Sequence, residues 1–312
     1  MMTDYFKPVP FDLFKSDKKA FGDALCRSFR ETGFAVVSGH TVDQGVIDRN
    51  LDATKAFFAL PDAEKLKYDG RQGGGQRGYT AFGTENAKGN AHADLKEFWH
   101  TGRALPEDSP YRATMADTPS VPEVPAFDGA TTALFDALDE MGREILEGVA
   151  LHLGLAEDWF DDKVNFGNSI LRLLHYPPQQ TPPPADTVRA GAHEDINVIT
   201  LLLGAEEAGL QVLHSSGEWL DVNPPAGALV INCGDMLQRL TGGVLPSTTH
   251  RVLNPSAAKF PRYSTPFFLH FNQDYLIEAL PRCVAEGGKA EAPIAAQDYL
   301  MERLREIGLV KA

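Results

Sequence analysis

The chain has 312 residues, of which 43% are hydrophobic and 23% charged, and a formal net charge of −14 at pH 7. This length and composition are ordinary for a globular protein with a full hydrophobic core. The acidic balance disfavours non-specific attraction to nucleic acid or an anionic membrane, and no apolar run approaches the length of a membrane span. We therefore expect no nucleic-acid or membrane partner, although a local basic pocket could still bind a small acid.

Three widely separated cysteines, Cys26, Cys233 and Cys283, form no CxxC pair. This usage argues against a disulfide framework and against a thiolate zinc site. The N-terminal stretch MMTDYFKPVPFDLF has no apolar signal core. The sequence therefore predicts a reducing, cytoplasmic location.

The first third predicts alternating helix and strand. Apolar residues recur on one helical face, and a glycine, an aspartate and a proline mark helix boundaries. Phe21, Leu25 and Phe29 predict a helix from Ser16 to Gly33, and a β-like run follows at 34–37. A second helix is predicted to start at Asp43 and to close at Pro61.

The next segment, YDGRQGGGQRGYTAFGTENAKGNAHADLKEFWH, is rich in glycine but contains neither phosphate-loop pattern, GxxxxGKS or GxGxxG before a helix. It is predicted to be a surface loop or, in a sharper hypothesis, a lid over a site. A proline-rich, irregular stretch is expected after it.

From Gly129 to about Gly154, apolar residues follow helical spacing, which predicts a long helix backing a sheet. After Ser169 at least six short β-rich runs are broken by Pro, Gly and Asn, as in a sandwich or barrel, with a hairpin turn at 216–217. The tail AAQDYLMERLREIG returns to helix. The predicted regions are an N-terminal helix and strand region at 1–125, the backing helix at 126–160, the β core at 161–275 and the tail at 276–312, within one compact unit.

The stretch HEDIN begins like the zinc-protease motif HExxH, but its fifth residue is Asn197. In extended chain, residues two apart point to the same side, so His193 and Asp195 would converge while Glu194 faces away as a bystander. His250, on another predicted strand, is the candidate third ligand. Two histidines and one carboxylate form the facial triad of non-haem Fe(II) oxygenases, which leaves positions open for a chelating co-substrate and O2. HxD alone is a weak pattern, and a structural histidine is its common alternative.

The stretch RYS places Arg262 and Ser264 on one face of a strand. A guanidinium grips a carboxylate in a planar, bidentate way, and a neighbouring hydroxyl donates a further hydrogen bond. This pair could hold the far carboxylate of a dicarboxylic acid. Taken alone, RxS is better interpreted as an arginine paired with a surface acid.

Together, HEDINVITLLL, GLQVL, GEWLDVNPPAGALVINCGDMLQRLTGG, STTHRV and RYS resemble the isopenicillin N synthase-like family of Fe(II)/2-oxoglutarate-dependent dioxygenases. FRETGFAVVSGH, RGYTAFG, DLKEFWHTGR and LRLLHYPP resemble the early segments of that family. The similarity runs from about Pro8 to Phe271. Leu174 and His175 replace the usual Asn-Tyr of that family, and VSGHT replaces Asn-His-Gly, so the identity of the substrate does not transfer.

The resemblance implies a mainly β fold with flanking helices (α+β), built on a distorted double-stranded β-helix or jelly roll. It implies Fe(II) bound by His193, Asp195 and His250. It further implies that Arg262, Ser264 and Tyr176 bind 2-oxoglutarate. The expected reaction oxidises a small molecule with O2, by hydroxylation or desaturation, and releases succinate and CO2; ascorbate is a candidate reductant.

Three alternatives stay open at this point. Some relatives use iron and O2 without 2-oxoglutarate, and others fragment 2-oxoglutarate to ethylene. A cupin-like zinc or manganese enzyme would need an HxH pattern and a nearby Glu. A non-catalytic β-scaffold that binds a small molecule is the third alternative. The oligomeric state is open as well.

Residues that could contact the substrate share an aromatic or basic side chain near the glycine-rich segment or the β core. If the basic ones face the pocket, an anionic substrate would suit them. The candidates are Arg77, Tyr79, Phe82, Lys88, Phe98, His100, His175, Phe268 and His270.

Overall fold

A computed structural model describes residues 5–70, 76–84, 95–178, 189–203, 209–253 and 260–306. The strands are β1 (Val9–Pro10), β2 (Phe34–Ser38), β3 (Gly78–Thr80), β4 (Glu97–Gly102), β5 (Ile170–Tyr176), β6 (Ala190–His193), β7 (Ile199–Leu203), β8 (Leu210–Leu213), β9 (Trp219–Asp221), β10 (Leu229–Cys233), β11 (His250–Val252), β12 (Arg262–Ser264), β13 (Pro266–Leu269), β14 (Leu276–Ile277) and β15 (Ile294–Ala295). The helices are α1 (Asp12–Ser16), α2 (Lys18–Thr32), α3 (Gln44–Phe58), α4 (Asp62–Lys65), α5 (Phe127–His152), α6 (Asp161–Val164), α7 (Asp235–Leu240), α8 (Pro281–Ala285) and α9 (Ala296–Glu306), with short 3-10 turns at Leu66–Tyr68 and Pro110–Ala113.

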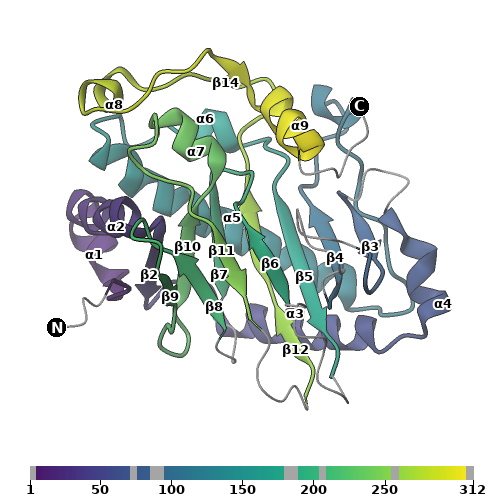
Figure 1. The fold of residues 1–312 in the computed structure, drawn as a ribbon. Helices are drawn as coiled ribbons and strands as arrows, with labels where there is room; N and C mark the ends of the chain where they lie inside the picture. Colours follow the sequence, from purple (N-terminus) through teal and green to yellow (C-terminus); the bar gives the residue numbers. More distant parts are fainter. Residues whose placement is uncertain are drawn as a thin grey trace.

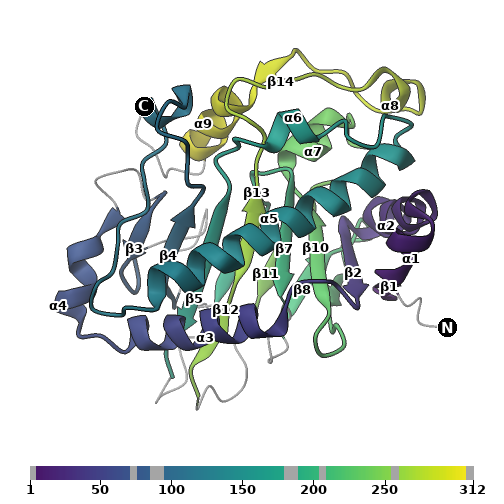
Figure 2. The ribbon, with the colours of Figure 1, turned by 180° about the vertical axis from the view of Figure 1, so that it is seen from behind.

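Two β-sheets form the core, and helices cover one of them. The larger sheet has the order β1-β2-β10-β7-β13-β5-β4-β3, with β12 also paired to β5, and the smaller has the order β6-β11-β8-β9. The smaller sheet lies in front of the larger one in Figure 1, and the long helices α5 and α3 cross in front of the larger sheet in the reverse view of Figure 2. The prediction of a mainly β core with flanking helices is confirmed. Within the described ranges, no helix combines the length and apolar character needed to span a membrane.

The helix boundaries of the first third follow most of their sequence signals. The carboxylate of Asp17 accepts from the Ala20 N–H, and Gly33 ends α2 with a φ of 73°, a backbone conformation that glycine adopts without strain. Asp43 caps α3 by accepting from Val46 N–H at 3.0 Å. α3 ends at Phe58 with Ala59 as its C-cap, and Pro61 follows two residues later, where it also precedes α4.

The glycine-rich segment contains two strands that its sequence does not predict. β4 pairs along its whole length with β5, from Glu97 opposite His175 to Gly102 opposite Ile170, and β3 extends the sheet by one more strand. All six residues of β4 are buried, so both faces of the strand are covered and no polar–apolar alternation marks it. Residues 71–75 and 85–94 lie outside the described residues, so the lid hypothesis stays a prediction.

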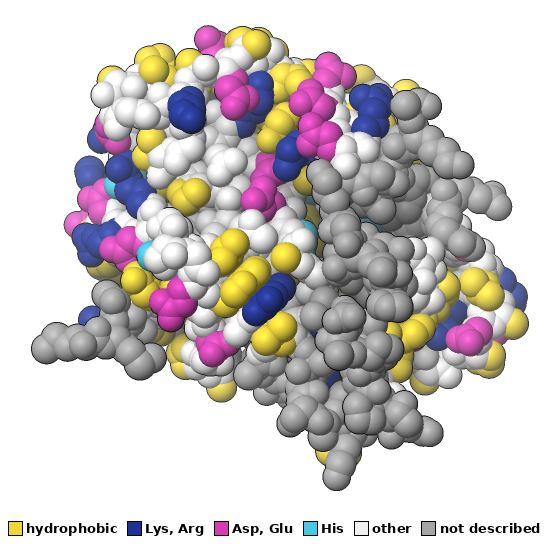
Figure 3. All heavy atoms as spheres, in the orientation of Figure 1, with side chains coloured by type: hydrophobic (Ala, Val, Ile, Leu, Met, Phe, Trp, Pro, Cys, Tyr) yellow, Lys and Arg dark blue, Asp and Glu magenta, His cyan; other side chains and the backbone are white. Residues whose placement is uncertain are grey.

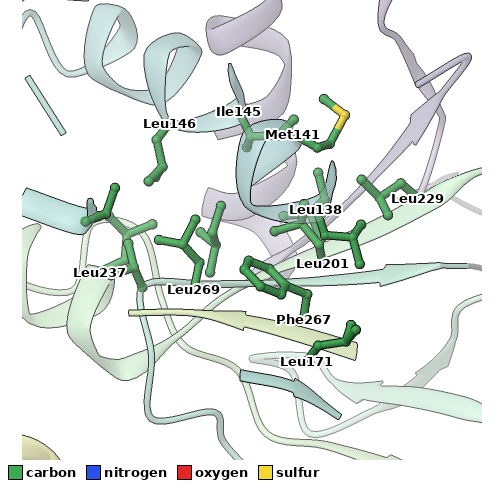
Figure 4. Close-up of a cluster of buried hydrophobic side chains, with 14 of the residues drawn as sticks. Leu138, Met141, Ile145, Leu146, Leu171, Leu201, Leu229, Leu237, Phe267 and Leu269 are labelled. Carbon is green, nitrogen blue, oxygen red and sulfur yellow. The ribbon is translucent and has the colours of Figure 1, made fainter. Parts of the chain in front are cut away.

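The outer face of the larger sheet packs on α5 and forms the main hydrophobic core. Residues that pair directly across antiparallel strands point to the same face of a sheet, so the registers assign each side chain to one face. Figure 4 shows the α5 side chains against the sheet. The contacting residues are Leu138, Met141, Ile145 and Leu146 of α5, and Leu171, Leu201, Leu229, Phe267 and Leu269 of the sheet.

The opposite face of the larger sheet, here called the inner face, is polar and aromatic. The pairs Thr200–Asn232, Thr200–Phe268 and Leu174–Phe98 lie on it. One end of this face, near β2 and β10, packs on the smaller sheet through an apolar cluster that includes Val36, Val230 and Val212. The remainder is therefore the place where a site can form.

The crossing of α2 over α5 gives a matched test of packing. A Cβ at Gly22 would lie 1.9 Å from the Gly148 carbonyl oxygen, whereas a Cβ at Gly129 on α5 would meet nothing within 4 Å. We expect Gly22→Ala to lower the free energy of unfolding by about 1–3 kcal/mol, because the helices must separate. Gly129→Ala should raise it by about 0.5–1 kcal/mol through helix propensity. Urea denaturation measures both, and equal effects would contradict the tight crossing.

Candidate metal centre and co-substrate pocket

The three predicted metal ligands meet where two strands of the smaller sheet pair. His250 of β11 lies directly opposite His193 of β6, and Asp195 follows just beyond the end of β6. The Nε2 atoms of His193 and His250 lie 3.8 Å and 3.9 Å from Asp195 Oδ1. One ligand atom from each residue lies within 4.8 Å of the other two, which is close enough for all three to reach one ion.

Backbone carbonyls orient both imidazoles. His193 Nδ1 lies 2.7 Å from the Gly191 carbonyl oxygen, and His250 Nδ1 lies 3.1 Å from that of Thr248. A carbonyl only accepts, so each Nδ1 carries the hydrogen and each Nε2 keeps its lone pair. This is the usual way in which a protein fixes the tautomer of a metal-binding histidine.

Asp195 is held through its second oxygen. Asp195 Oδ2 accepts from the Thr200 hydroxyl at 2.6 Å and from the Asn232 amide at 2.9 Å, which leaves Oδ1 facing the histidines. The Asp235 N–H donates to the Asp195 carbonyl at 2.8 Å, so the start of α7 fixes the backbone too. This approach needs a glycine, because a Cβ at Gly234 would lie 2.0 Å from Asn197 Oδ1.

Glu194 is not the bystander that its position suggests. Its side chain does point away from those of His193 and Asp195, but its Oε1 accepts from the Thr249 hydroxyl at 2.9 Å. Thr249 immediately precedes His250. Glu194 therefore joins the two ligand-bearing strands on the side away from the triad.

The charge states suit metal binding. Burial raises the pKa of Asp195, but His250, His193 and the hydrogen bonds from Asn232 and Thr200 outweigh it, so its pKa lies below the ordinary value. Desolvation of the ring, whose side chain keeps 43% exposure, and the charge of the adjacent His250 lower the pKa of His193 to about 4. At neutral pH, Asp195 is a carboxylate and His193 a neutral imidazole, which are the forms that coordinate metals.

The residues expected to bind 2-oxoglutarate lie together on the inner face. Arg262 of β12 pairs with Tyr176 of β5, and Ser264 pairs with Leu174. All four side chains are buried, and the Arg262 guanidinium carbon lies 5.2 Å from the Tyr176 ring centroid. Leu174 occupies the place of the amide that related sequences carry, and it adds an apolar wall.

Three basic residues near this pocket are missed by sequence reasoning. Arg189, 1% exposed, lies with its guanidinium carbon 5.4 Å from the Tyr176 ring, and the charge of buried Lys96 helps to lower the pKa of His193. Arg172 shares a strand face with Leu174 and Tyr176. Period-two counting back from Tyr176 could have found Arg172. No spacing rule points to Arg189 or Lys96.

Four of the predicted substrate contacts lie on the inner face. Phe98 and His100 alternate along β4, opposite Leu174 and Arg172, and their rings are 4.8 Å apart. Phe268 lies opposite Thr200, the residue that donates to Asp195. His270 follows on the same face, and burial lowers its pKa to about 4.

Two predicted substrate contacts are on the wrong face. Tyr79 is buried in the helical core beside Phe57, and His175 stacks on Tyr263 and bonds Glu97 Oε1 at 2.7 Å. Both alternate with inner-face neighbours, so strand geometry turns them away from the metal ligands.

The remaining three candidates have different outcomes. The Arg77 guanidinium reaches the inner face, because a Cβ at Gly102, which alternates with Phe98 and His100 on that face, would lie 1.8 Å from Arg77 Nε; Arg77 also donates to Asn168 Oδ1 at 2.7 Å. Phe82 is 50% exposed at a surface turn. Lys88 lies outside the described residues.

Comparison with known proteins identifies the family. Residues 9–123 match the model described as non-haem dioxygenase in morphine synthesis N-terminal, and residues 167–271 match the 2OG-Fe(II) oxygenase superfamily. The chain is 35% identical over 278 residues to a 2-oxoglutarate-Fe(II) type oxidoreductase of Emericella nidulans, covering 86% of this chain and 79% of that protein. The chain belongs to the 2OG-Fe(II) oxygenase superfamily.

Solved structures agree with this assignment. A 2OG-Fe(II) oxygenase family protein of Caulobacter crescentus shares 52% identity and a TM-score of 0.91, over 98% of this chain and 100% of that one. A full-length Neurospora crassa protein, solved in complex with alpha-KG and thymine, shares 28% identity and a TM-score of 0.85, over 98% of each chain. The predicted jelly roll is confirmed. The oxygenase is a 2-oxoglutarate-dependent dioxygenase that uses Fe(II) and 2-oxoglutarate to oxidise a small molecule.

The hydrogen bond from Thr200 to Asp195 can be tested by an isosteric substitution. We expect Thr200→Val to weaken Fe(II) binding by about 10-fold, because the carboxylate loses one of the two groups that orient it. Thr200→Ser keeps the hydroxyl and should bind Fe(II) nearly as the wild type does. Anaerobic titration measures both affinities, with circular dichroism as the check on folding. Unchanged affinity in Thr200→Val would show that Asn232 alone suffices to hold Asp195.

Proposed function

We propose that this dioxygenase hydroxylates or desaturates a small, flat molecule that carries a carboxylate or carbonyl group. His193, Asp195 and His250 bind Fe(II), and Arg262, Ser264 and Tyr176 bind 2-oxoglutarate. The observation that carries the assignment is the convergence of two Nε2 atoms and one carboxylate oxygen beside a face that holds the buried Arg262 and Ser264. The three free, buried cysteines support a cytoplasmic location for this enzyme.

The donor set fits iron and the co-substrate. Two neutral imidazoles and one carboxylate are the facial arrangement of non-haem Fe(II) enzymes, and the iron and 2-oxoglutarate together supply O2 activation, with succinate and CO2 as products. Arg262 supplies a planar pair of N–H donors for the far carboxylate of 2-oxoglutarate, and the Ser264 hydroxyl supplies one more. Leu174, Tyr176 and Phe98, which pack as one small cluster, exclude water from this end.

The substrate side of the inner face is built around Arg172. Its guanidinium carbon lies 4.4 Å from the Phe98 ring centroid and 5.4 Å from that of Phe268, and its Nε donates to His100 Nε2 at 2.6 Å. His100 accepts this bond, so it is neutral and fixes the plane of the guanidinium. Arg172 lies four residues from Tyr176 along β5, about 13 Å away, which separates it from the 2-oxoglutarate anchor.

This arrangement favours a flat substrate with an oxygen acceptor. Phenyl rings beside a guanidinium provide stacking surface, and the guanidinium binds carboxylates or paired carbonyl oxygens. Thymine, which the Neurospora crassa protein binds, is a flat ring of that kind, and this relative supports the same chemical class here. A carboxylate is the stronger partner for Arg172, so we propose an anionic substrate.

The co-substrate assignment predicts the effect of Arg262. Adding 2-oxoglutarate to the anaerobic Fe(II) protein should produce the visible charge-transfer band of the chelate. Arg262→Leu should raise the Kd for 2-oxoglutarate by about 10- to 100-fold, because a charge-assisted hydrogen bond is lost, while Fe(II) affinity stays the same. Arg262→Lys should recover some of the loss. A band of wild-type affinity in Arg262→Leu would remove Arg262 from the binding site, and ethylene in the headspace under O2 would replace the hydroxylation proposal with fragmentation of 2-oxoglutarate.

The substrate assignment predicts a charge preference. Benzoate and benzamide are matched flat probes that differ in charge. We expect benzoate, but not benzamide, to shift the charge-transfer band of the Fe(II)–2-oxoglutarate complex. Arg172→Gln should weaken this response by about 10-fold or more, with the Kd for 2-oxoglutarate unchanged. Equal responses to both probes, or an unaltered response in Arg172→Gln, would contradict an anionic substrate held by Arg172.

A further inference from the structure

The C-terminal helix α9 contacts the back of the metal centre. Its Arg303 donates from Nε to Asp235 Oδ2 at 3.1 Å, and its Nη2 lies 3.9 Å from Glu194 Oε2. Both residues are directly connected to the triad. The Asp235 N–H donates to the Asp195 carbonyl, and Glu194 lies between His193 and Asp195 in the chain. Acidic and basic side chains lie next to one another over α9 in Figure 3.

The partners of Arg303 connect it to every ligand of the triad. The Asp235 N–H donates to the Asp195 carbonyl, and the Glu194 carboxylate accepts from Thr249, the neighbour of His250. Glu194 is also bonded through the chain to His193. One guanidinium thus contacts the side chains of two residues, Asp235 and Glu194, which are linked by backbone or side-chain hydrogen bonds, or by the chain itself, to the positions of all three proposed ligands.

The Asp235 carboxylate makes this contact more than a surface ion pair. Its side chain is 2% exposed, whereas exposed ion pairs contribute little. A buried carboxylate that loses its charged partner is strongly destabilised and must move or take up a proton. Among the described residues, Arg303 is the cation that forms a salt bridge with Asp235.

Other contacts hold α9 in place without Arg303. The Ala296 and Gln297 N–H groups donate to the Tyr275 and Gln273 carbonyls, and Tyr299 packs under the guanidinium of Arg239 at 5.1 Å. Tyr299 and Leu300 are buried. The helix can therefore remain docked when the Arg303 side chain is changed, which makes its role separable from that of α9 as a whole.

We propose that Arg303 is a positioning residue for the iron centre. Through Asp235 and Glu194 it fixes the backbone of the HxD segment, so that the docking of the C-terminal helix sets the affinity and geometry of the metal site. This inference rests on the proposed ligand set of His193, Asp195 and His250. It gives α9, which lies beyond the residues matched by the two family models, a role in the metal centre.

The test compares metal binding by full-length variants. Arg303→Gln removes the charge but keeps most of the side-chain length, Arg303→Lys keeps the charge, and Arg305→Gln removes an exposed charge from the same helix. Each metal-free protein is titrated with Co(II), a redox-stable probe whose visible spectrum reports coordination geometry. Thermal unfolding of the metal-free proteins is recorded in parallel.

We expect Arg303→Gln to weaken Co(II) binding by about 3- to 10-fold and to alter its visible spectrum; loss of a direct partner of a metal ligand usually costs about 10-fold or more, and Arg303 acts through one further residue. Arg303→Lys should recover some of the affinity, and Arg305→Gln should match the wild type in both readouts. If Arg303→Gln does not fold, Glu194→Gln is the second variant, with the same spectral change expected.

Two results would overturn the inference. One is wild-type affinity and spectrum in Arg303→Gln, even with a lower melting temperature, because Arg303 would then act on stability alone. The other is an equal loss in Arg305→Gln, which would indicate a general charge effect. Failure of the proposed ligand set looks different: His250→Ala would then bind Co(II) as tightly as the wild type.

Discussion

The site depends on one backbone pairing, in which His193 of β6 lies directly opposite His250 of β11. Antiparallel pairing brings the Cα atoms of directly opposed residues to within about 5.5 Å, so the two imidazoles face a common point before any ion is bound. Asp195 follows just beyond the end of β6, and its Oδ1 lies 3.8 Å from His193 Nε2 and 3.9 Å from His250 Nε2. A slip of this register by one residue would turn His250 to the opposite face and separate the ligands.

The surrounding elements hold the paired strands and Asp195 in place. The larger sheet buries its outer face on α5, which makes it a rigid floor, and it places Thr200 and Asn232 under the carboxylate of Asp195. On the other side, Thr249 and Glu194 join the two ligand strands, and α7 and α9 lie behind them. The triad is therefore supported from the larger sheet and from the C-terminal helix at once.

The pocket is basic although the chain as a whole is acidic. The protein is acidic overall, with a net charge of −14, yet the described side chains near the pocket include Lys96, Arg172, Arg189 and Arg262. A basic pocket in an acidic protein attracts small anions locally while the outer surface repels polyanions. This contrast suits an enzyme whose co-substrate is a dicarboxylate.

The sequence by itself predicted the candidate metal ligands and the arginine–serine pair, and it determined the long backing helix and the caps of α2 and α3, because the HxD, RxS, helical and capping patterns are local spacings within the chain. Only the tertiary structure decided which face each strand residue occupies. Tyr79 and His175 point away from the site because strand pairing sets Tyr79 opposite Trp99 and His175 opposite Glu97, on the outer face of the larger sheet. Arg172 and Arg189 joined the pocket, and Arg303 reached the back of the triad from the far end of the chain. Contacts of this kind join residues that are distant in sequence, so local sequence patterns do not predict them.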